Sequence, residues 1–286
     1  MGTHRTLVPT DVLAAHLDDP SWVVVDCRFE LADPDAGARA YADAHIPGAA
    51  HADLDRDLSG PTTGGTGRHP LPAPQTMVAT FGRLGIGPGR QVVAYDQSKG
   101  TFASRLWWML RYAGHDAVAV LDGGLAKWRR DERPERGDVE LPRAQSFTAA
   151  WRPEMLIDAA AVLAGLGDPE RQLLDARAPE RFTGSTEPLD PVAGHIPGAV
   201  NHPCLTNVGE DWTFLQAEEL RRRFETRLGR TTPDQVVSYC GSGVTACHNL
   251  LALAHAGLDG GRLYAGSWSE WCSDPARPIA TGDEPS

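Results

Sequence analysis

A chain of 286 residues is long enough for two domains of about 150 residues each. Its hydrophobic fraction of 41% is ordinary for a protein with a buried core, and its net charge of −11 argues against nucleic acid or an anionic membrane as the main partner. The five cysteines form no CxxC pair and no zinc-like spacing with histidine, so we expect no metal and no cofactor.

We expect no export signal at the N-terminus, because residues 1–10 lack the apolar core of a signal peptide. Nor does any apolar run approach the roughly 20 residues that span a bilayer. We therefore expect a reduced, cytoplasmic protein.

The first half of the chain alternates strands with helices. Residues 22–26 are continuously apolar up to Asp26, which is typical of a buried parallel strand. Further strands are predicted at 91–96 and 118–121, and helices at 74–84 and from about Thr101.

The second half repeats the first in the same order. The matching segments are 173–175 with 24–26, 194–199 with 44–49, 236–240 with 92–96, and 265–271 with 122–128. This order predicts an α/β protein made by tandem duplication, with domains at 1–135 and 150–286. Each domain should contain a mostly parallel sheet with helices on both faces. Between them, residues 130–138 are charged and contain proline, as linkers do.

A short loop after the predicted strand 236–239 opens with Cys240. Gly241 and Gly243 let the backbone curl so that several N–H groups converge on one anionic atom, and the following helix dipole also favours thiolate over thiol. A buried structural cysteine is the other interpretation of this pattern. In the first repeat the corresponding residue is Asp96, so the fold does not itself require a cysteine there.

The chain resembles the two-domain rhodanese-type sulfurtransferases. The resemblance is carried by the two His-Ile-Pro-Gly-Ala segments, and it covers nearly the whole chain. The run Cys-Gly-Ser-Gly-Val-Thr at 240–245 is similar to the active loop of the 3-mercaptopyruvate branch. The thiosulfate-specific branch usually carries basic residues directly after the cysteine, and this loop has none.

The resemblance implies transfer of sulfur from a small anionic donor through a Cys240 persulfide. The acceptor would be a thiol, such as thioredoxin, or cyanide. The backbone of the loop would stabilise the thiolate and the persulfide through Gly241, Gly243, Val244 and Thr245.

If the family's residue roles are assigned to this chain by position, Ser242 would relay a proton to or from the donor. His45 would form a triad with it, oriented by Asp35 or Asp33. The other interpretation of His45 is a turn-capping histidine, as expected for its counterpart His195.

Arg181 matches the family arginine that holds the donor's carboxylate, and a surface pair with Glu180 is the other interpretation. The family often has a second arginine a few residues on, but the run 186–191 contains none. Arg105 is a candidate to replace it. Losing one charge-assisted hydrogen bond would cost about 1.5–3 kcal/mol.

Three other functions compete with sulfur transfer from 3-mercaptopyruvate. A cysteine-dependent phosphatase needs an arginine six residues after the cysteine, and that position is Ala246. A catalytically silent persulfide-binding module and a thiosulfate-specific sulfurtransferase remain as alternatives. Among the other cysteines, Cys27, Cys204 and Cys272 are expected to be partly exposed.

Overall fold

The computed structural model describes residues 3–283, and its internal contacts divide the chain into two units. Unit 1 comprises residues 3–60, 71–152 and 208–214, and unit 2 comprises 61–70, 153–207 and 215–283. The units therefore differ from two contiguous halves by two short segments, 61–70 and 208–214.

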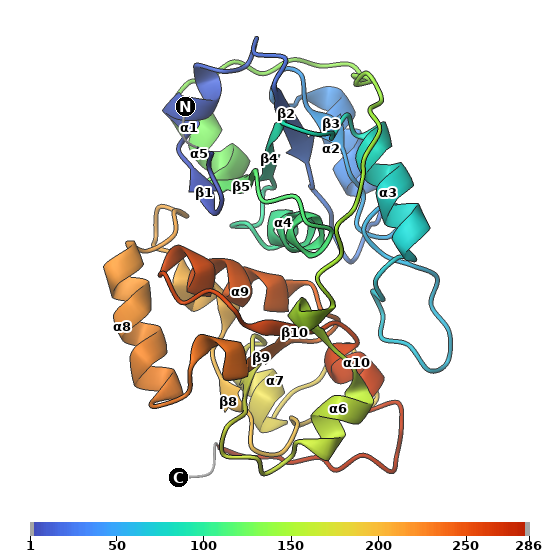
Figure 1. The fold of residues 1–286 in the computed structure, drawn as a ribbon, viewed down its shortest axis with the longest axis vertical. Coiled ribbons are helices and arrows are strands. Elements are labelled where there is room, and N and C mark those ends of the chain that lie inside the picture. Colours follow the sequence, from blue (N-terminus) through green and yellow to red (C-terminus); the bar gives the residue numbers. More distant parts are fainter. Residues whose placement is uncertain (1–2, 284–286) are drawn as a thin grey trace. The chain divides into compact units, whose positions relative to one another are not determined.

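Unit 1 contains a five-stranded parallel sheet in the order β1-β5-β4-β2-β3 (Figure 1). Its strands are β1 (Leu7–Val8), β2 (Trp22–Asp26), β3 (Ala50–His51), β4 (Gln91–Tyr95) and β5 (Val118–Leu121). Its helices are α1 (Thr10–Ala14), α2 (Ala36–Asp43), α3 (Pro74–Arg83), α4 (Ala103–Tyr112) and α5 (Gly124–Arg130). Side chains of α1, α2 and α5 pack with those of β2, β4 and β5, and α4 packs against β4 and β5.

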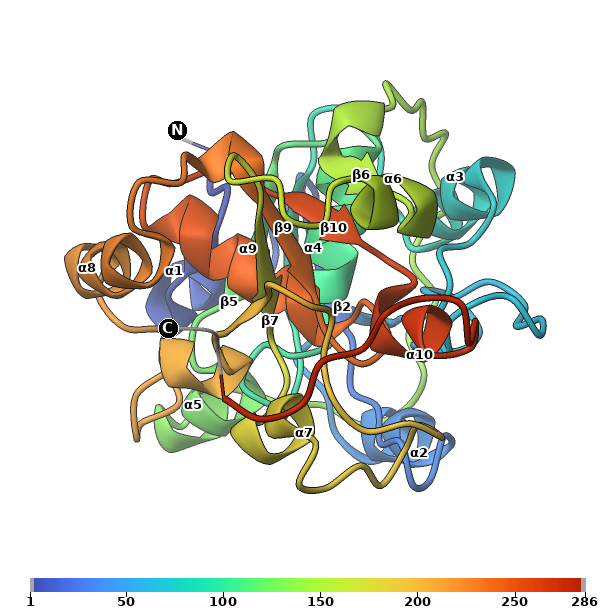
Figure 2. The same ribbon diagram turned by 90° about the horizontal axis from the view of Figure 1, so that it is seen from below.

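Unit 2 contains the same sheet again, in the order β6-β10-β9-β7-β8, with all neighbours parallel. The strands are β6 (Leu156–Ile157), β7 (Gln172–Asp175), β8 (Val200–Asn201), β9 (Val236–Tyr239) and β10 (Arg262–Tyr264). The helices are α6 (Ala159–Ala164), α7 (Pro179–Thr183), α8 (Ala217–Leu228), α9 (Thr245–His255) and α10 (Ser267–Trp271), with short 3-10 turns η1 (Pro153–Met155), η2 (Cys204–Asn207) and η3 (Pro233–Gln235). Figure 2 shows α8 and α9 to one side of β7, β9 and β10, and α6, α7 and α10 to the other.

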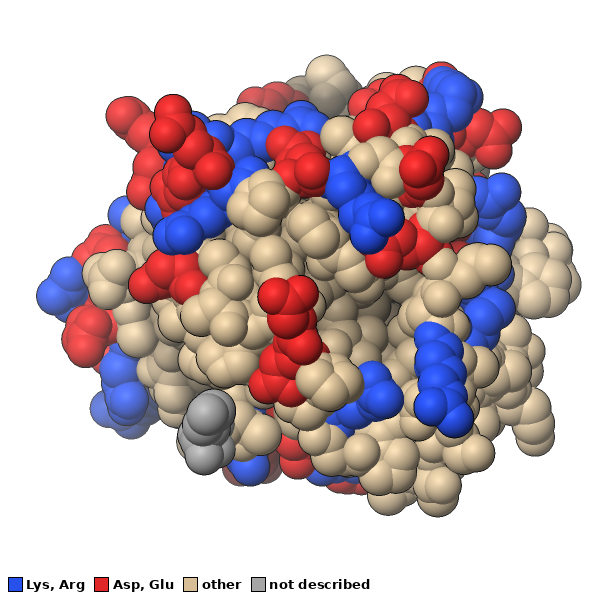
Figure 3. Space-filling model, turned by 90° about the horizontal axis from the view of Figure 1, so that it is seen from above, with Lys and Arg blue, Asp and Glu red and all other residues tan. Residues whose placement is uncertain are grey.

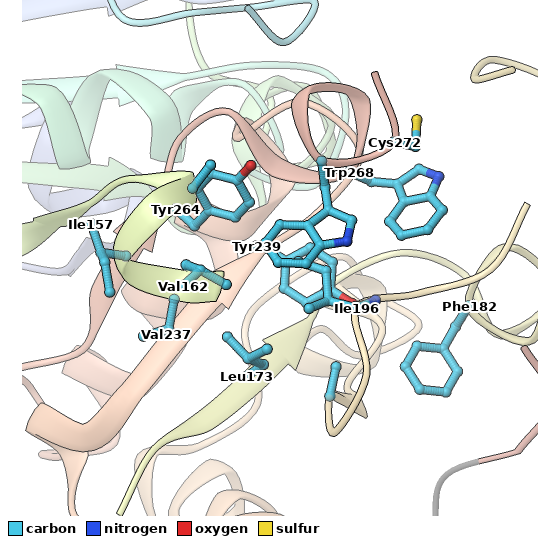
Figure 4. Close-up of a cluster of buried hydrophobic side chains, with 13 residues drawn as sticks. Ile157, Val162, Leu173, Phe182, Ile196, Val237, Tyr239, Tyr264, Trp268 and Cys272 are labelled. Atoms are coloured by element: carbon cyan, nitrogen blue, oxygen red, sulfur yellow. Dashed lines mark hydrogen bonds between the residues drawn. The ribbon is translucent and has the colours of Figure 1, made fainter. Parts of the chain in front are cut away.

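The strands of unit 2 bury side chains on both faces. Val237 and Tyr239 point into a cluster with side chains of α6, α7 and α10 (Figure 4). Ser238, between them, faces the other way and donates a hydrogen bond to the carbonyl of Ala246 in α9. Each large apolar side chain buried in this way contributes about 1.5–3 kcal/mol. Such double burial explains why β9 does not alternate exposed polar and buried apolar residues: all four of its residues are buried, and its one serine is hydrogen-bonded to α9.

The predicted duplication is confirmed, because the two units share their internal contacts as well as their strand order. In unit 1, Arg28 binds the Asp26 carboxylate and the carbonyl of Ala44. In unit 2, Arg177 binds Asp175 and the carbonyl of Gly194 in the same way. Acidic and basic side chains are interspersed on the face shown in Figure 3. Within residues 3–283 no helix combines the length and the apolar character that crossing a membrane requires.

Candidate active site

The Cys240 loop joins β9 to α9 at the carboxyl end of the sheet of unit 2. The Cys240 side chain is buried, with 2% of the residue exposed, and the N–H of Gly243 donates to its Sγ at 3.1 Å. Gly243 has a φ of 78°, and a Cβ there would lie 2.2 Å from the carbonyl oxygen of Ala265. Only glycine fits this position, so the curl of the loop around the sulfur depends on it.

Helix α10 fixes the loop from the other side. The N–H groups of Trp268 and Ser269 donate to the carbonyls of Cys240 and Gly241, both at 2.9 Å. The Oγ of Ser267 accepts the N–H of Cys240 at 3.0 Å. These three hydrogen bonds tie the backbone of the loop to the start of α10.

The hydroxyl of Ser242 contacts a histidine. Its Oγ lies 2.7 Å from Nδ1 of His69, and both residues are buried. Either the hydroxyl donates to the ring or the ring N–H donates to the hydroxyl, according to the tautomer. A serine and a histidine at this distance can pass a proton between them.

His45, the histidine predicted to pair with Ser242, has a different role. Its Nδ1 lies 2.7 Å from the carbonyl of Tyr41, and its ring stacks on that of Tyr41 in unit 1. Its counterpart His195 binds the carbonyl of Phe182 and stacks on Phe182 in unit 2. The prediction for His45 was wrong, because the histidine of the repeated His-Ile-Pro-Gly motif ties its own turn to the preceding segment in both units.

The acidic residues proposed to orient His45 lie on the surface. Asp35 has a side chain that is 75% exposed, 4.0 Å from Arg56, and Asp33 pairs with Arg39 at 2.5 Å. Since Nδ1 of His45 is bound to a backbone carbonyl, neither carboxylate orients the ring. The prediction of a triad with Asp35 was therefore also wrong.

Two guanidinium groups lie against the loop. A Cβ on Gly241 would be 2.9 Å from Nη2 of Arg68 and 3.3 Å from Nη1 of Arg181. Arg181 was predicted from the sequence, whereas Arg68 was not. Nη2 of Arg181 donates to Asp190 at 3.0 Å, and Arg68 donates to the other oxygen of the same carboxylate.

Glu187 completes this charged cluster. It accepts bonds from Nε and Nη2 of Arg181 at 2.7–3.1 Å. Burial raises the pKa of Glu187, but Arg181 and the N–H groups of Leu189 and Asp190 outweigh it and hold the pKa below its usual value. Burial raises the pKa of Asp190 above its usual value despite its arginine partners.

Arg105, proposed as the second carboxylate-binding arginine, is fully buried in α4 of unit 1. Its Nε and Nη2 donate to the carbonyl of Leu58 at 3.3–3.4 Å. The prediction was wrong because this guanidinium serves the backbone of its own unit. The second guanidinium beside Gly241 is that of Arg68, which comes from the irregular segment 61–70.

The remaining predicted positions lie where the loop meets α9. Val244 precedes α9 and is buried, and Thr245 is its first residue. Contrary to expectation, Cys27, Cys204 and Cys272 are all buried, as is Cys247. Burial raises the pKa of Cys204 to about 12, so this thiol stays protonated near neutral pH.

Unit 1 contains the same loop with a carboxylate in place of the thiol. Asp96 accepts four backbone hydrogen bonds, at 2.7–2.9 Å, from the N–H groups of Ser98, Gly100, Phe102 and Ala103. The loop between the fourth strand and the following helix is thus an anion-binding nest, and in unit 1 its own side chain fills it.

Comparisons with known proteins place these features in a family. The model of the Rhodanese-like domain matches residues 9–131 and 158–274. A probable 3-mercaptopyruvate sulfurtransferase of Pseudomonas aeruginosa is 50% identical over 279 residues, which cover 97% of this chain and 98% of the relative. A putative thiosulfate sulfurtransferase of Mycobacterium tuberculosis is 40% identical and covers 91% of this chain and 90% of its own length.

Solved structures agree with the sequence comparisons. The 3-mercaptopyruvate sulfotransferase SseA of Escherichia coli is 34% identical, superimposes with a TM-score of 0.81, and covers 93% of this chain and 100% of its own. The 3-mercaptopyruvate sulfurtransferase of Leishmania major is 30% identical, with a TM-score of 0.82 over 93% of this chain and 74% of its own. The chain therefore belongs to the rhodanese family and carries two rhodanese-like domains in tandem.

Proposed function

We propose that the chain transfers sulfane sulfur from 3-mercaptopyruvate to a thiol or cyanide acceptor through a persulfide on Cys240. One observation carries this proposal: within unit 2, a buried thiol, a serine–histidine pair and two guanidinium groups converge on one short loop. Each of them matches a separate need of the reaction.

The first need is a nucleophile. The Cys240 thiolate attacks the donor sulfur, a sulfur–sulfur bond forms, and the donor's carbon–sulfur bond breaks with its electron pair left on carbon. The backbone N–H of Gly243, 3.1 Å from Sγ, is placed to stabilise negative charge on the sulfur before and after transfer.

The second need is a proton for the leaving group. The departing fragment is the enolate of pyruvate, and it becomes pyruvate when its carbon takes up a proton. The Ser242 hydroxyl, which is hydrogen-bonded to His69, supplies that proton. The imidazole of His69 then returns a proton to the Ser242 oxygen. Thiosulfate releases sulfite, which needs no proton on carbon, so the Ser242–His69 pair favours the carbon-based donor.

The third need is a site for the donor's carboxylate. Arg181 provides it, because its Nη1 lies next to Gly241 while its other nitrogens are held by Glu187 and Asp190. A guanidinium fixed in this way loses little side-chain entropy when the donor binds. It also provides local positive charge in a protein whose net charge is −11.

The second half of the cycle returns Cys240 to the thiolate. A thiol such as thioredoxin, or cyanide, attacks the outer sulfur of the persulfide and removes it. The preferred acceptor is found by measuring turnover with thioredoxin, a small thiol and cyanide at a saturating concentration of the donor.

The donor is tested by comparing turnover of 3-mercaptopyruvate and thiosulfate by the same enzyme. We expect a higher kcat/KM with 3-mercaptopyruvate, and Ser242→Ala should slow this donor more than thiosulfate. Thiosulfate as the better donor, or equal losses with both donors, would count against the proposal. Absence of turnover with either donor would favour a silent persulfide-binding module.

A further inference from the structure

We infer that unit 2 carries a second anion-binding site, on helix α8 and apart from the Cys240 loop, which takes a small molecule that bears a phosphoryl group. The site is a cavity of about 620 Å³. Pockets that bind small ligands typically have volumes of about 300–1,000 Å³. The cavity is lined by side chains of α8 and of the chain that follows β8: His202, Glu219, Arg222, Arg223, Thr226 and Arg227.

The sequence of α8 places its polar side chains along one side of the cavity. Positions 219, 222, 223, 226 and 227 are three or four residues apart, so their side chains form one stripe on the helix. Leu220, Phe224 and Leu228 form a neighbouring stripe that is buried in unit 2. The ring of His202 lies 4.5 Å from that of Phe224, measured between centroids. One wall of the cavity is therefore α8, and the other is the chain after β8.

Glu219 holds two of the arginines side by side. Its Oε1 accepts a hydrogen bond from Nε of Arg223 at 2.8 Å, and its Oε2 accepts one from Nη2 of Arg222. The arginine pair beside Gly241 has the same arrangement, in which Asp190 gives one oxygen to each arginine. A shared carboxylate reduces the repulsion between two guanidinium groups, so both can bind one anion.

Arg223 is also fixed from the other wall of the cavity. Its Nη1 donates to the carbonyl of Thr206 in η2 at 3.0 Å. A guanidinium held from two sides loses little side-chain entropy when a ligand binds. The side chains of Arg222 and Arg223 are 71% and 44% exposed, so a ligand can reach them from solvent.

The cavity is positively charged, whereas the protein as a whole is acidic. Three arginines and one glutamate line it, and the net charge of the chain is −11. Burial lowers the pKa of His202, and Arg227 and Arg223 lower it further against the hydrogen bond to Asn207, so the imidazole is uncharged at neutral pH. The guanidinium groups thus select an anion. A phosphoryl group suits three of them better than a carboxylate does, because it offers more acceptor oxygens.

This cavity is separate from the donor site. None of the described residues that line it belongs to the Cys240 loop or to α7, which carries Arg181. Helix α8 lies to one side of β7, β9 and β10, whereas α7 and α10 lie to the other (Figure 2). His202 is tied to α9 through Asn207, which donates to Asn249 at 2.8 Å. A ligand in the cavity should therefore stabilise unit 2 without occupying the place of the sulfur donor.

The test uses the full-length protein and pyrophosphate, which carries two phosphoryl groups. Calorimetry at about 0.15 M NaCl measures binding under physiological screening of charge, and the rise in melting temperature measures it independently. The wild type should bind pyrophosphate with a Kd of about 0.1 mM or lower. Arg223→Gln and Arg227→Gln should each weaken this binding by about tenfold or more, because each removes a charge-assisted contact.

Two further ligands distinguish the possible sources of the phosphoryl group. Inorganic phosphate represents a free anion, and glycerol 3-phosphate represents an ester. Binding of either one, with the same dependence on Arg223 and Arg227, supports the site, and the tighter of the two identifies the source. If neither binds, pyrophosphate binding would reflect its charge alone, which would contradict a phosphoryl site.

Arg221→Gln is the matched control. Arg221 is on the same helix and pairs with Glu225 at 2.8 Å, but it does not line the cavity. This variant removes the same charge from α8, so it should bind pyrophosphate as tightly as the wild type. Arg181→Gln should also retain the binding, because it alters only the donor site.

Three results would overturn the inference. The first is no binding of pyrophosphate by the wild type. The second is equal weakening in Arg221→Gln and Arg223→Gln, which would indicate a general attraction to the charge of α8. The third is binding lost in Arg181→Gln but retained in Arg223→Gln, which would place pyrophosphate at the donor site.

A structural effect of the substitutions is detected without any ligand. If Arg223→Gln lowers the melting temperature of the free protein, Arg222→Gln replaces it, because the Arg222 side chain is mostly exposed. Arg222→Gln should weaken pyrophosphate binding at an unchanged melting temperature, and unchanged binding in this variant and in Arg227→Gln would contradict the site. None of these measurements depends on sulfur transfer, so they stand whether or not the proposed function is correct.

Discussion

At the scale of single residues, proton transfer depends on the contact between Ser242 and His69. His69→Ala should lower kcat with 3-mercaptopyruvate by about 10²-fold or more, because it removes the imidazole that returns a proton to the Ser242 oxygen. Melting temperature should change little, since His69 lies in an irregular segment rather than in a strand or helix. The measurement is steady-state release of pyruvate.

His45 provides the matched control. Because its ring is bound to Tyr41 and lies in the core of unit 1, His45→Ala should lower the free energy of unfolding by about 1–3 kcal/mol. Turnover per folded molecule should stay close to that of the wild type. A large loss of kcat in His45→Ala together with a small one in His69→Ala would reverse the two assignments.

Gly241 must be glycine because two arginine side chains leave no room for a side chain there, and not because its backbone conformation demands glycine. A methyl group there would force the guanidinium groups of Arg68 and Arg181 to move by a few tenths of an ångström. Gly241→Ala should therefore raise KM for 3-mercaptopyruvate by about three- to tenfold and change stability little. Gly64→Ala, where a Cβ meets no atom within 4 Å, should leave KM unaltered, and an equal KM in both variants would contradict this role.

Cys240, Ser242 and Arg181 can be identified as candidates from the sequence, whereas Arg68 and His69 cannot. The first three follow regular strands or resemble a family motif, so their places in the chain indicate their roles. Arg68 and His69 lie in an irregular segment with no periodicity and no matching sequence in the second half. Their partners Asp190 and Ser242 are more than a hundred residues away in the chain, so only the folded structure pairs them.

At the scale of elements, the backbone N–H groups of the loop after β4 bind the carboxylate of Asp96. Asp96→Asn should lower the free energy of unfolding by about 1–3 kcal/mol, because an amide has one acceptor oxygen for the N–H groups that two carboxylate oxygens now satisfy. Sulfur loading of Cys240 should be unchanged. Urea unfolding checks the first expectation, and a variant as stable as the wild type would contradict it.

The turn from Glu187 to Asp190 should give a pH-dependent contribution to stability. The folded protein holds the pKa of Glu187 below its ordinary value of 4.5. Its ionised form therefore stabilises the fold fully above about pH 4.5, and this stabilisation is lost as pH falls through the folded pKa.

Glu187→Gln tests this sign. Its deficit in unfolding free energy, about 1–3 kcal/mol at pH 7, should be constant above pH 4.5 and shrink at more acidic pH. Urea unfolding of both proteins between pH 7 and pH 3 measures it. A deficit that grows on acidification would contradict the ion pairs with Arg181.

Regular elements were predictable where the pattern was long or continuously apolar. The strand expected at 22–26 is β2, and the helix expected at 74–84 is α3, one residue shorter. Two-residue strands such as β1 and β3 have no detectable period, so they appear only through their pairing in the sheet.

At the scale of the whole molecule, the duplication could be recognised from the sequence. Both repeats retain similar sequences in the segments that form the turns around the sheet. Segments 61–70 and 208–214 occupy equivalent places, between β3 and α3 and between β8 and α8. Their assignment to the opposite units could not be predicted, because the two segments have no sequence similarity that marks them as a pair. This assignment brings Arg68 and His69 into the unit that contains Cys240. Each unit thus keeps the family fold, while the site depends on a segment that no repeat pattern indicates.

The proposed sulfur transfer depends on one thiol among five. All five cysteines are buried, and burial raises the pKa of Cys27, Cys204 and Cys272, which keeps these three thiols protonated and unreactive. Cys240 alone lies in the loop beside the serine–histidine pair and the arginines.

The most direct test is the intact mass of the protein after incubation with 3-mercaptopyruvate, followed by removal of the donor. The wild type should gain the mass of one sulfur atom, mapped to Cys240, and lose it on addition of cyanide. Cys240→Ser should gain none, although its four other cysteines are present. Sulfur uptake and turnover by Cys240→Ser, or no uptake by the wild type, would contradict transfer through a Cys240 persulfide.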